Sequence, residues 1–392
     1  MISVNQAKAL VKEHTQPLSP LLFPLATAAG LTLAQDIFAV CDIPAFAQSS
    51  MDGYAIRFED HDQSLNIIGE MAAGTPSTFT IAKGEAARIF TGAPLPQGAD
   101  TVVMQEKVTV VGTSLRIADP NLIQGSNVRN KGSEILTGAL AMEKGNLLTP
   151  AAIGFLAGIG IIEVSVFPQP KIAIILTGNE LQQPGLPLQF GQVYESNSYA
   201  LVAALKFIGI TEIEVVEAKD ELEALTDVLR LALQKNDVVL LTGGVSVGDY
   251  DFVIQAANSC GVEQVFHKVK QKPGKPLYFG KKQDQLIFGL PGNPSSVLNC
   301  FYNYVMPSMA LLSNTANKVL QIEAILAAAY QKPSGLTHFL KGLYADGKAM
   351  PLGAQESYRL SSFAQANCLI CLEEEQTTFN IGDLVTVFLL PN

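Results

Sequence analysis

The sequence is short of positive charge. Its 26 Lys and Arg residues face 36 Asp and Glu residues, which gives a net charge of -10 over 392 residues. General nucleic-acid binders gain most of their affinity from basic contacts to phosphate. The charge balance therefore argues against a protein that binds nucleic acid.

Long apolar runs are also missing. The longest, from Ala151 to Ile162, is interrupted by glycines and is too short to cross a bilayer, so we expect a buried helix that ends near Gly158 and no membrane partner. The residues from Met1 to Thr15 lack the continuous apolar stretch of a secretion signal. These features predict a cytoplasmic protein.

Cysteines are few. The chain has five, an odd number scattered through mostly apolar segments, which does not suggest a disulfide framework. Cys368 and Cys371 form a C-x-x-C pair in a strand-like run, but no second cysteine pair completes a zinc site. We expect reduced, buried thiols, with this pair packed in a core.

The remaining composition is that of a multidomain globular protein. Hydrophobic residues make up 48% of the chain and charged residues 16%, which excludes disorder. The patterns predict a multidomain α/β plus β fold. We expect a helical and linker domain from residues 1–38 and 139–168, a β-rich N-terminal insert over 39–138, a central doubly wound α/β domain over 169–318, and a small C-terminal β-barrel or sandwich over 319–392.

The α/β domain has the clearest pattern, because short apolar runs alternate with amphipathic stretches. Helices should lie between its strands, one beginning near Ser196, whose hydroxyl can cap it, and another behind Asp220. Four runs are expected to be strands: Lys171–Leu176, Ile213–Glu217, Val238–Leu241 and Leu286–Leu290.

A glycine-rich segment, Thr242–Asp251, follows the third of these strands. Ligands of open α/β sheets bind at the carboxyl ends of strands, where glycines let backbone N–H groups approach an anion. Asp249 and Asp251 would repel that anion without a cation, which suggests Mg²⁺. A structural turn is the alternative. The candidates for binding phosphate are Gly243, Gly244, Ser246 and Gly248.

A second candidate follows the strand Leu286–Leu290. Asn293 suits an N-cap and Pro294 the first helical position, so free N–H groups at this helix start could bind another anion. An ordinary helix start is the alternative. The candidate residues are Pro291, Gly292, Asn293, Pro294 and Ser295.

Charged side chains complete this sheet edge. The basic segment from Lys268 to Lys282 could be a solvated hairpin, but its Lys272–Pro276 turn could hold Lys272 and Lys275 toward a phosphate. Glu180 follows the first strand and adds a third carboxylate for the metal. Anion sites, lysines and carboxylates on one edge describe a nucleotide-like or pyrophosphate substrate with a metal.

Together with three loop-like segments nearer the N-terminus, which alone are typical of turns, these motifs resemble the molybdopterin molybdenumtransferase family, which includes the C-terminal domain of gephyrin. The resemblance covers nearly the whole chain. It rests on five motifs in order: S-M-D-G-Y-A from Ser50, T-G-A-P-L-P from Thr91, G-G-V-S-V-G from Gly243, K-P-G-K-P from Lys272 and P-G-N-P from Pro291. A further loop, from Lys131 to Glu134, is part of the same pattern.

The resemblance implies an activity: insertion of molybdate into adenylylated molybdopterin with release of AMP, dependent on Mg²⁺. It also implies an elongated homodimer with a site shared between subunits. Ser361 and Ser362 resemble the contribution of the final domain. The residues implied to be catalytic are Asp52, Thr91, Glu134, Glu180, Asp220, Asp251, Lys268 and Lys272.

The sequence departs from the family pattern at three positions. Asn179 and Glu134 stand where aspartate is frequent, and Lys341 stands where arginine is common. The change at Asn179 removes a candidate metal ligand. The change at Lys341 exchanges a bidentate donor for a point charge.

Two other functions stay open at this stage. The adenylyltransferase that makes the adenylylated substrate resembles only residues 171–313, so the other domains argue against it. A scaffold like gephyrin is the second, but the chain shows neither gephyrin's extra N-terminal domain nor its long linker. We expect an enzyme, with the adenylyltransferase and proteins that mature molybdoenzymes as candidate partners.

Overall fold

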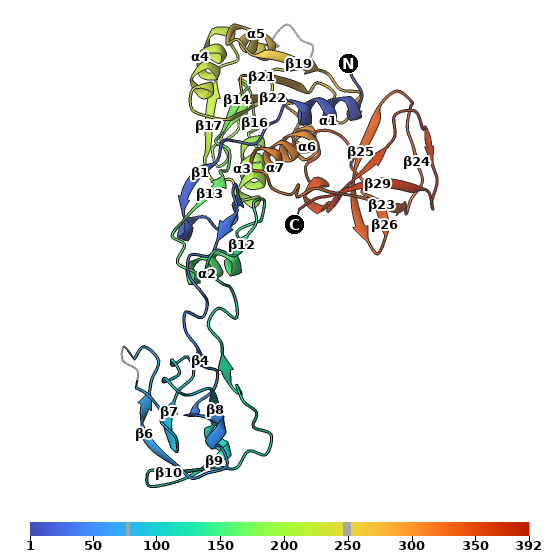
Figure 1. The fold of residues 1–392 in the computed structure, drawn as a ribbon. Helices are drawn as coiled ribbons and strands as arrows, with labels where there is room; N and C mark the ends of the chain where they lie inside the picture. Colours follow the sequence, from blue (N-terminus) through green and yellow to red (C-terminus); the bar gives the residue numbers. More distant parts are fainter. Residues whose placement is uncertain (76–78, 246–251, 392) are drawn as a thin grey trace. The chain divides into compact units, whose positions relative to one another are not determined.

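A computed structural model describes residues 1–75, 79–245 and 252–391. The chain divides into two compact units (Figure 1). The first contains residues 1–21, 30–32 and 166–392, and the second contains residues 22–29 and 33–165. Within the described ranges, no helix is both long and apolar enough to span a bilayer.

A six-stranded sheet forms the centre of the first unit, in the order β17-β14-β18-β22-β21-β19. The first four strands run parallel, and the last two pairings, β22 with β21 and β21 with β19, are antiparallel. The parallel strands lie where the sequence predicts them, so this part of the prediction is confirmed. Their bounds are β14 (Ile172–Thr177), β17 (Ile213–Ala218), β18 (Val238–Thr242) and β22 (Gln285–Leu290), followed by β21 (Tyr278–Lys282) and β19 (Glu263–His267).

Helices cover both faces of this sheet (Figure 1). Along β14, Ile172 and Ile174 enter one core while Ala173 and Ile175 enter the other, because successive side chains of a strand point to opposite faces. The doubly wound fold is thus confirmed. On one face lie α1 (Val4–Glu13), α3 (Asn197–Phe207), α6 (Pro294–Cys300), η4 (Phe301–Val305) and α7 (Met306–Leu312), and on the other α4 (Leu222–Leu233) and α5 (Phe252–Ser259).

Two details of the helices differ from expectation. Ser196 precedes α3 but its side chain makes no capping bond, so that prediction is wrong. The buried Glu195 accepts instead from the backbone N–H of Ser198 at 2.8 Å and from its hydroxyl at 2.6 Å. Helix α1 packs in the core of the first unit, whereas residues 139–165 belong to the second unit. The four-domain boundaries stay a prediction.

The C-terminal region of the first unit is a closed barrel, as expected. Its sheet runs β20-β25-β26-β23-β29-β27, and β27 pairs back with β25 to close five strands. The sixth strand, β20, comes from the basic segment of the α/β part. The bounds are β20 (Gln271–Lys272), β23 (Leu320–Leu326), β25 (Thr337–Ala345), β26 (Lys348–Pro351), β27 (Cys368–Leu372) and β29 (Leu384–Leu389), with a small pair β24 (Tyr330–Gln331) and β28 (Thr378–Phe379) and the turn η5 (Phe363–Gln365).

The cysteines behave nearly as expected. All five are free thiols, and Cys368 and Cys371 are buried in β27, so their packing in the core is confirmed. Burial raises the pKa of both thiols to about 12. Cys41 is the exception, since it is only half-buried.

The second unit is rich in strands, which confirms the predicted class of the N-terminal insert. Its main sheet runs β8-β5-β7-β6-β10-β9, with bounds β5 (Gly53–Ile56), β6 (Leu65–Met71), β7 (Glu85–Ile89), β8 (Thr101–Met104), β9 (Val108–Val111) and β10 (Ser114–Ile117). Two short ladders pair β4 (Gln48–Ser49) with β11 (Val128–Arg129) and β3 (Ile37–Phe38) with β12 (Leu140–Met142). Short turns are η1 (Leu25–Thr27), η2 (Phe58–Asp60) and η3 (Gln105–Lys107), and the chain crosses between units near β1 (Leu21–Pro24), β2 (Thr32–Leu33) and β13 (Glu163–Phe167).

Helix α2 (Pro150–Gly158) confirms the predicted helix but not its burial. Thr149 caps it by accepting from the N–H of Ala152 at 3.2 Å. Only Ala152 and Leu156 of this apolar helix are buried. Its other large apolar residues, Ile153 and Phe155, are half-buried, so the helix is less buried than predicted.

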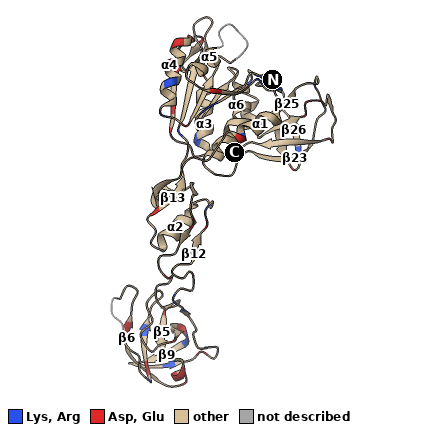
Figure 2. Cartoon of the chain, turned by 45° about the horizontal axis from the view of Figure 1, so that its top comes forward, with Lys and Arg blue, Asp and Glu red and all other residues tan. Residues whose placement is uncertain are grey.

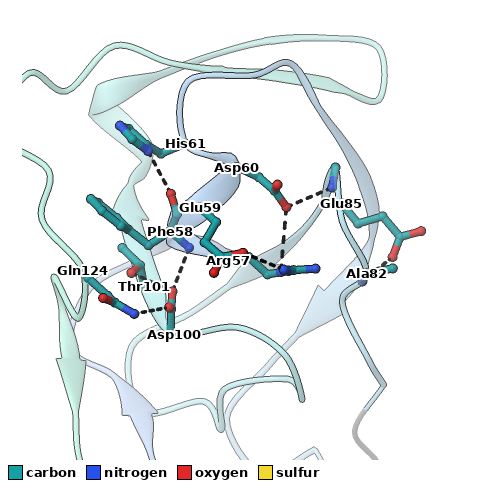
Figure 3. A network of polar contacts seen from close by, with 11 residues as sticks. Arg57, Phe58, Glu59, Asp60, His61, Ala82, Glu85, Asp100, Thr101 and Gln124 are labelled. Carbon is teal, nitrogen blue, oxygen red and sulfur yellow. Dashed lines mark hydrogen bonds and ion pairs between the residues drawn. The ribbon is translucent and has the colours of Figure 1, made fainter.

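Carboxylates hold the loops of the β-rich sheet together (Figure 3). Asp100 accepts from the N–H of Phe58 at 2.8 Å and from the hydroxyl of Thr101 at 2.9 Å on one oxygen, while its other oxygen accepts from Gln124. Buried Asp60 accepts from the N–H of Gly84 at 3.0 Å. Such bonds satisfy backbone groups that lie outside the ladders. Over the whole chain, acidic and basic residues are scattered among a larger number of uncharged residues (Figure 2).

Candidate active site

Three glycine turns meet at the carboxyl edge of the central sheet. Gly178 follows β14, Gly243 follows β18 and Gly292 follows β22. A Cβ on Gly243, whose φ is +88°, would lie 2.8 Å from the carbonyl oxygen of Thr177, and one on Gly292 would lie 3.8 Å from the Cα of Gly243. Only glycine fits at Gly243. These three turns, each at the end of a parallel strand, therefore lie at the same edge of the sheet.

The predicted anion site at the start of α6 needs correction. Its first N–H groups are not free: Ser295 donates to the carbonyl of Ser357 at 3.0 Å, and Ser296 and Val297 donate to the carbonyl of Asn293. Pro294 has no N–H. The N–H of Gly243 is also used, since it donates to the carbonyl of Leu290 at 3.1 Å.

Other polar groups remain available at this edge. Within the described part of the chain, no acceptor meets the N–H of Gly244, Gly292 or Asn293. Asn197 of α3 donates to the carbonyl of Gly292 at 2.9 Å, but its own amide oxygen is buried without a described partner, as is the hydroxyl of Ser295. Buried polar atoms without partners are costly, so these favour a polar ligand. Ser246, Gly248, Asp249 and Asp251 lie outside the described residues.

Two carboxylates lie close together beside these turns. Partial burial raises the pKa of Asp220, and the negative charge of Glu180 raises it further. The carboxylate of Glu180 folds back over Gly178, where a Cβ would lie 2.8 Å from its oxygen. Among the described residues no cluster of three metal-binding side chains is present. Two neighbouring carboxylates still suit a hard divalent cation, which would relieve their repulsion.

A cavity of about 400 Å³ lies next to this pair, at the ends of β14 and β17. Asn179 and Leu181, the neighbours of Glu180, line it together with Lys219, the neighbour of Asp220. The strands β15 (Leu181–Gln182) and β16 (Val193–Tyr194) border it. The other lining residues are Leu176, Gly178, Gln182, Gln183, Glu195, Glu217 and Ala218.

The basic turn at Lys272–Pro276 is braced by residues of α6 and of β20. Asn299 donates to the carbonyl of Pro273 at 3.0 Å, and Gln271 donates to that of Gly274 at 2.9 Å. Gly274 has φ +89°, and a Cβ there would lie 2.6 Å from the sulfur of Cys300. The turn is therefore held in one conformation, as its composition predicts.

The four lysines from Lys268 to Lys275 divide into two groups. Lys270 forms an ion pair with Glu374 of the barrel at 2.6 Å. Lys268, Lys272 and Lys275 form no ion pair with any described residue. The second group therefore remains available to an anionic ligand.

In the second unit, the structure brings together Asp52 and Thr91. One carboxylate oxygen of Asp52 accepts from the N–H and the hydroxyl of Thr91, both at 2.8 Å. These bonds lower the pKa of Asp52. Glu134 is exposed, and its backbone N–H donates to Ile43 at 2.9 Å. Among the described residues, no hydrogen bond or ion pair connects the carboxylate of Glu134 with Asp52.

Three candidates of the barrel have different surroundings. The hydroxyl of Ser362 is buried and donates to the carbonyl of Ala354 at 2.8 Å, whereas Ser361 is exposed. The ammonium group of Lys341 is buried and donates to the carbonyls of Ala354 at 2.8 Å and Arg359 at 3.0 Å. Lys341 therefore has a structural role. The family pattern, in which arginine is common at this position, did not suggest that role.

Sequence reasoning missed two residues of this edge. Asn197 and Ser357 contact the turn after β22, but neither belongs to a recognisable motif. Ser357 lies in a loop of the barrel that is far from the turn in sequence. No local signal marks it.

Known proteins match this arrangement over its full length. Three family models match in succession: the MoeA N-terminal region (domain I and II) over residues 2–160, a probable molybdopterin binding domain over 173–310, and the MoeA C-terminal region (domain IV) over 323–390. The molybdopterin molybdenumtransferase of Haemophilus influenzae is 34% identical, with 99% of this chain and 98% of the relative covered. This chain belongs to the molybdopterin molybdenumtransferase family.

Further comparisons agree with this assignment. The molybdopterin molybdenumtransferase of Nostoc sp. is 36% identical, with 94% of this chain and 88% of the relative covered. The solved structure of a molybdopterin biosynthesis MoeA protein from Pyrococcus horikosii shares 31% identity and a TM-score of 0.84 over 100% of both chains. The predicted class is confirmed: the protein is a transferase of molybdenum cofactor biosynthesis. The match extends well beyond the α/β part on which the adenylyltransferase alternative rested.

Proposed function

We propose that this protein inserts molybdate into adenylylated molybdopterin and releases AMP. The observation that carries the proposal is the edge of the central sheet, where glycine turns of three strands meet the carboxylates of Glu180 and Asp220 beside a cavity of about 400 Å³. A ligand with phosphates and a polar ring system needs such a site.

The carboxylate pair supports a role for Mg²⁺. Burial raises the pKa of Asp220, and the negative charge of Glu180 raises it further, so a cation between the two carboxylates would be favourable. They would hold Mg²⁺ together with Asp249 and Asp251, which the sequence places in the adjoining segment. When bound, the ion would supply positive charge to the pyrophosphate and to the departing AMP.

The remaining residues have roles that follow from their contacts. Lys268, Lys272 and Lys275 would bind phosphate oxygens directly, since no described carboxylate neutralises them. The N–H groups of Gly244, Gly292 and Asn293 would donate to the same phosphates. Molybdate is a dianion and needs donors too, and Ser361 is the exposed hydroxyl of the two predicted for this purpose.

A homodimer with shared sites completes the proposal. Asp52, Thr91 and Glu134 of one subunit would face the α/β part of the other. Support comes from apolar side chains that the second unit leaves exposed, which is typical of surfaces that bind another protein. They are Phe38, Val40, Leu136, Leu140, Leu147 and Ile162. The cytoplasmic location and the protein partners stay predictions from the sequence.

A product assay tests the proposal. The purified protein is given adenylylated molybdopterin with and without molybdate and Mg²⁺, and AMP is measured. We expect AMP release that requires both ions. Adenylylation of molybdopterin from ATP would indicate the adenylyltransferase instead, and no reaction of either kind would favour a scaffold.

A further inference from the structure

A loop of the barrel holds the turn after β22 from outside the α/β part. This loop, residues 352–362, is called the bridging loop. The carbonyl of Ser357 accepts from the N–H of Ser295 at 3.0 Å, and its hydroxyl accepts from the side-chain amide of Asn293 at 3.0 Å. The start of α6 is thus capped by a residue 62 positions further along the chain, while the side chain of its own N-cap, Asn293, makes no capping bond.

A buried cation fixes the bridging loop. The ammonium group of Lys341, whose residue is 2% exposed, donates to the carbonyls of Ala354 at 2.8 Å, Arg359 at 3.0 Å and Glu356 at 3.4 Å. These carbonyls lie on both sides of Ser357 in the sequence. No strand pairing satisfies the backbone carbonyls of this segment, so the side chain of Lys341 donates hydrogen bonds to them.

Neighbouring side chains add to this anchoring. Gln355 donates to the backbone carbonyl of Lys341 at 2.9 Å and accepts from its N–H at 3.0 Å. The hydroxyl of Ser362 donates to the carbonyl of Ala354 at 2.8 Å. Phe363, directly after the loop, stacks on Tyr302 of η4 with ring centroids 6.0 Å apart. The loop is therefore bound at both ends as well as at Ser357.

We propose that Ser357 is a positioning residue for the substrate, and that Lys341 acts through it. The hydroxyl of Ser357 fixes the side-chain amide of Asn293 by accepting a hydrogen bond from its N–H. The amide oxygen of Asn293 then has no donor among the described residues. Ser357 also holds the N–H of Ser295, so the turn keeps Gly292 and Asn293 in place for an anion. The identity of the ligand in this inference rests on the proposed function. The hydrogen bonds by which Ser357 holds the turn do not depend on it.

Steady-state kinetics with adenylylated molybdopterin test the role of Ser357. We expect Ser357→Ala to raise KM about threefold to tenfold, the usual effect of one hydrogen bond, with kcat within about twofold. Ser357→Thr, which keeps the hydroxyl, should restore the wild-type KM. Ser334→Ala, an exposed serine in a loop of the same barrel, is the matched control. A KM for Ser357→Ala equal to that of the control overturns the proposal.

A double-mutant cycle tests whether Ser357 affects substrate binding through Asn293. If Ser357 acts through Asn293, Ser357→Ala should raise KM in the wild type but not further in Asn293→Ala. Additive effects would show that the hydroxyl acts elsewhere and would overturn this route. Lys341→Met should raise KM at least as much as Ser357→Ala, and Lys341→Arg should recover part of the loss. Lys348→Met, an exposed lysine of β26, is its control.

Amide hydrogen exchange separates this inference from the proposed function. The folded variants Ser357→Ala and Lys341→Met should exchange faster than the wild type over residues 291–297, and the controls should not. If the wild type releases no AMP, the proposed function fails, but faster exchange still supports the positioning. Unchanged exchange in both folded variants overturns it, whatever the activity.

Discussion

Asp52 and Asp100 are bound by the same kind of donors but should differ in function. Each accepts on one oxygen from a backbone N–H and from a threonine hydroxyl, at 2.8 to 2.9 Å. We expect Asp52→Ala to lose nearly all AMP release, because its carboxylate belongs to the proposed site. Both variants should lose some thermal stability, because each removes an acceptor for two donors.

The comparison of these two variants is the measurement. Thermal unfolding and molybdate-dependent AMP release are recorded for Asp52→Ala and Asp100→Ala in parallel. Asp100→Ala should stay active per folded molecule. If Asp52→Ala loses activity only in proportion to its folded fraction, as Asp100→Ala would, the role of Asp52 is structural.

The carboxyl group of Asp220 offers a direct test of the metal pair. Burial and the charge of Glu180 raise its pKa, so Glu180→Gln should lower it, and Mg²⁺ added to the wild type should lower it as well. Carbon NMR of labelled aspartates measures the pKa, with Asp220→Asn to assign the signal. Glu223→Gln, an exposed glutamate on α4, is the control. An unchanged pKa in Glu180→Gln would show that the two groups do not interact.

At the scale of elements, Lys8 links α1 to the barrel. Its ammonium group lies 3.8 Å from the ring centroid of Phe388 in β29, and burial lowers its pKa from 10.5 to about 8. Between pH 8 and 10.5 the unfolded chain binds this proton while the folded chain does not. The free energy of unfolding should therefore rise with pH across this window, by at most about 3 kcal/mol, and the attraction to the ring reduces the rise.

Urea unfolding from pH 7 to 10.5 checks this prediction. Lys8→Met should remove the rise and should be more stable than the wild type near pH 7, because no charge is then buried. Lys12→Met, an exposed lysine in the last turn of α1, should keep the rise. Parallel curves for wild type and Lys8→Met would mean that the ammonium group is not buried in solution.

At the scale of the whole molecule, the exposed apolar residues of the second unit predict a dimer. Phe38 of β3 and Leu140 of β12 are register partners and are 53% and 45% exposed. Replacing both by glutamate should give a monomer in analytical ultracentrifugation and abolish activity, since charges cannot be buried unpaired in an interface. Val110 and Val111 of β9, replaced in the same way, serve as the control. A double variant that stays dimeric places the interface elsewhere.

Mixed dimers test the shared site. An Asp52→Ala subunit combined with an Asp220→Ala subunit should recover roughly half of the wild-type rate, because one of two sites is then intact. Verified heterodimers are isolated with two affinity tags and assayed for AMP release. No recovery would place Asp52 and Asp220 of one subunit in the same site.

The sequence by itself determined the elements of this protein. The parallel strands, α2 and the turns with glycine follow from patterns within a few residues, since a strand buried on both faces is rich in apolar residues and a left-handed turn favours glycine. The motifs also determined the family. For the same reason Gly178, Gly243 and Gly292 could be placed at one sheet edge before the structure was known.

Only the tertiary structure decided which groups at that edge are free and which are used. Ser295 offers its N–H to the carbonyl of Ser357, Glu180 approaches Asp220, and the ammonium group of Lys341 is buried under a loop and not presented to a ligand. These partners are separated by 13 to 62 positions in the chain. A hydrogen bond acts over about 3 Å and leaves no periodic trace in the sequence, so packing alone selects its partner.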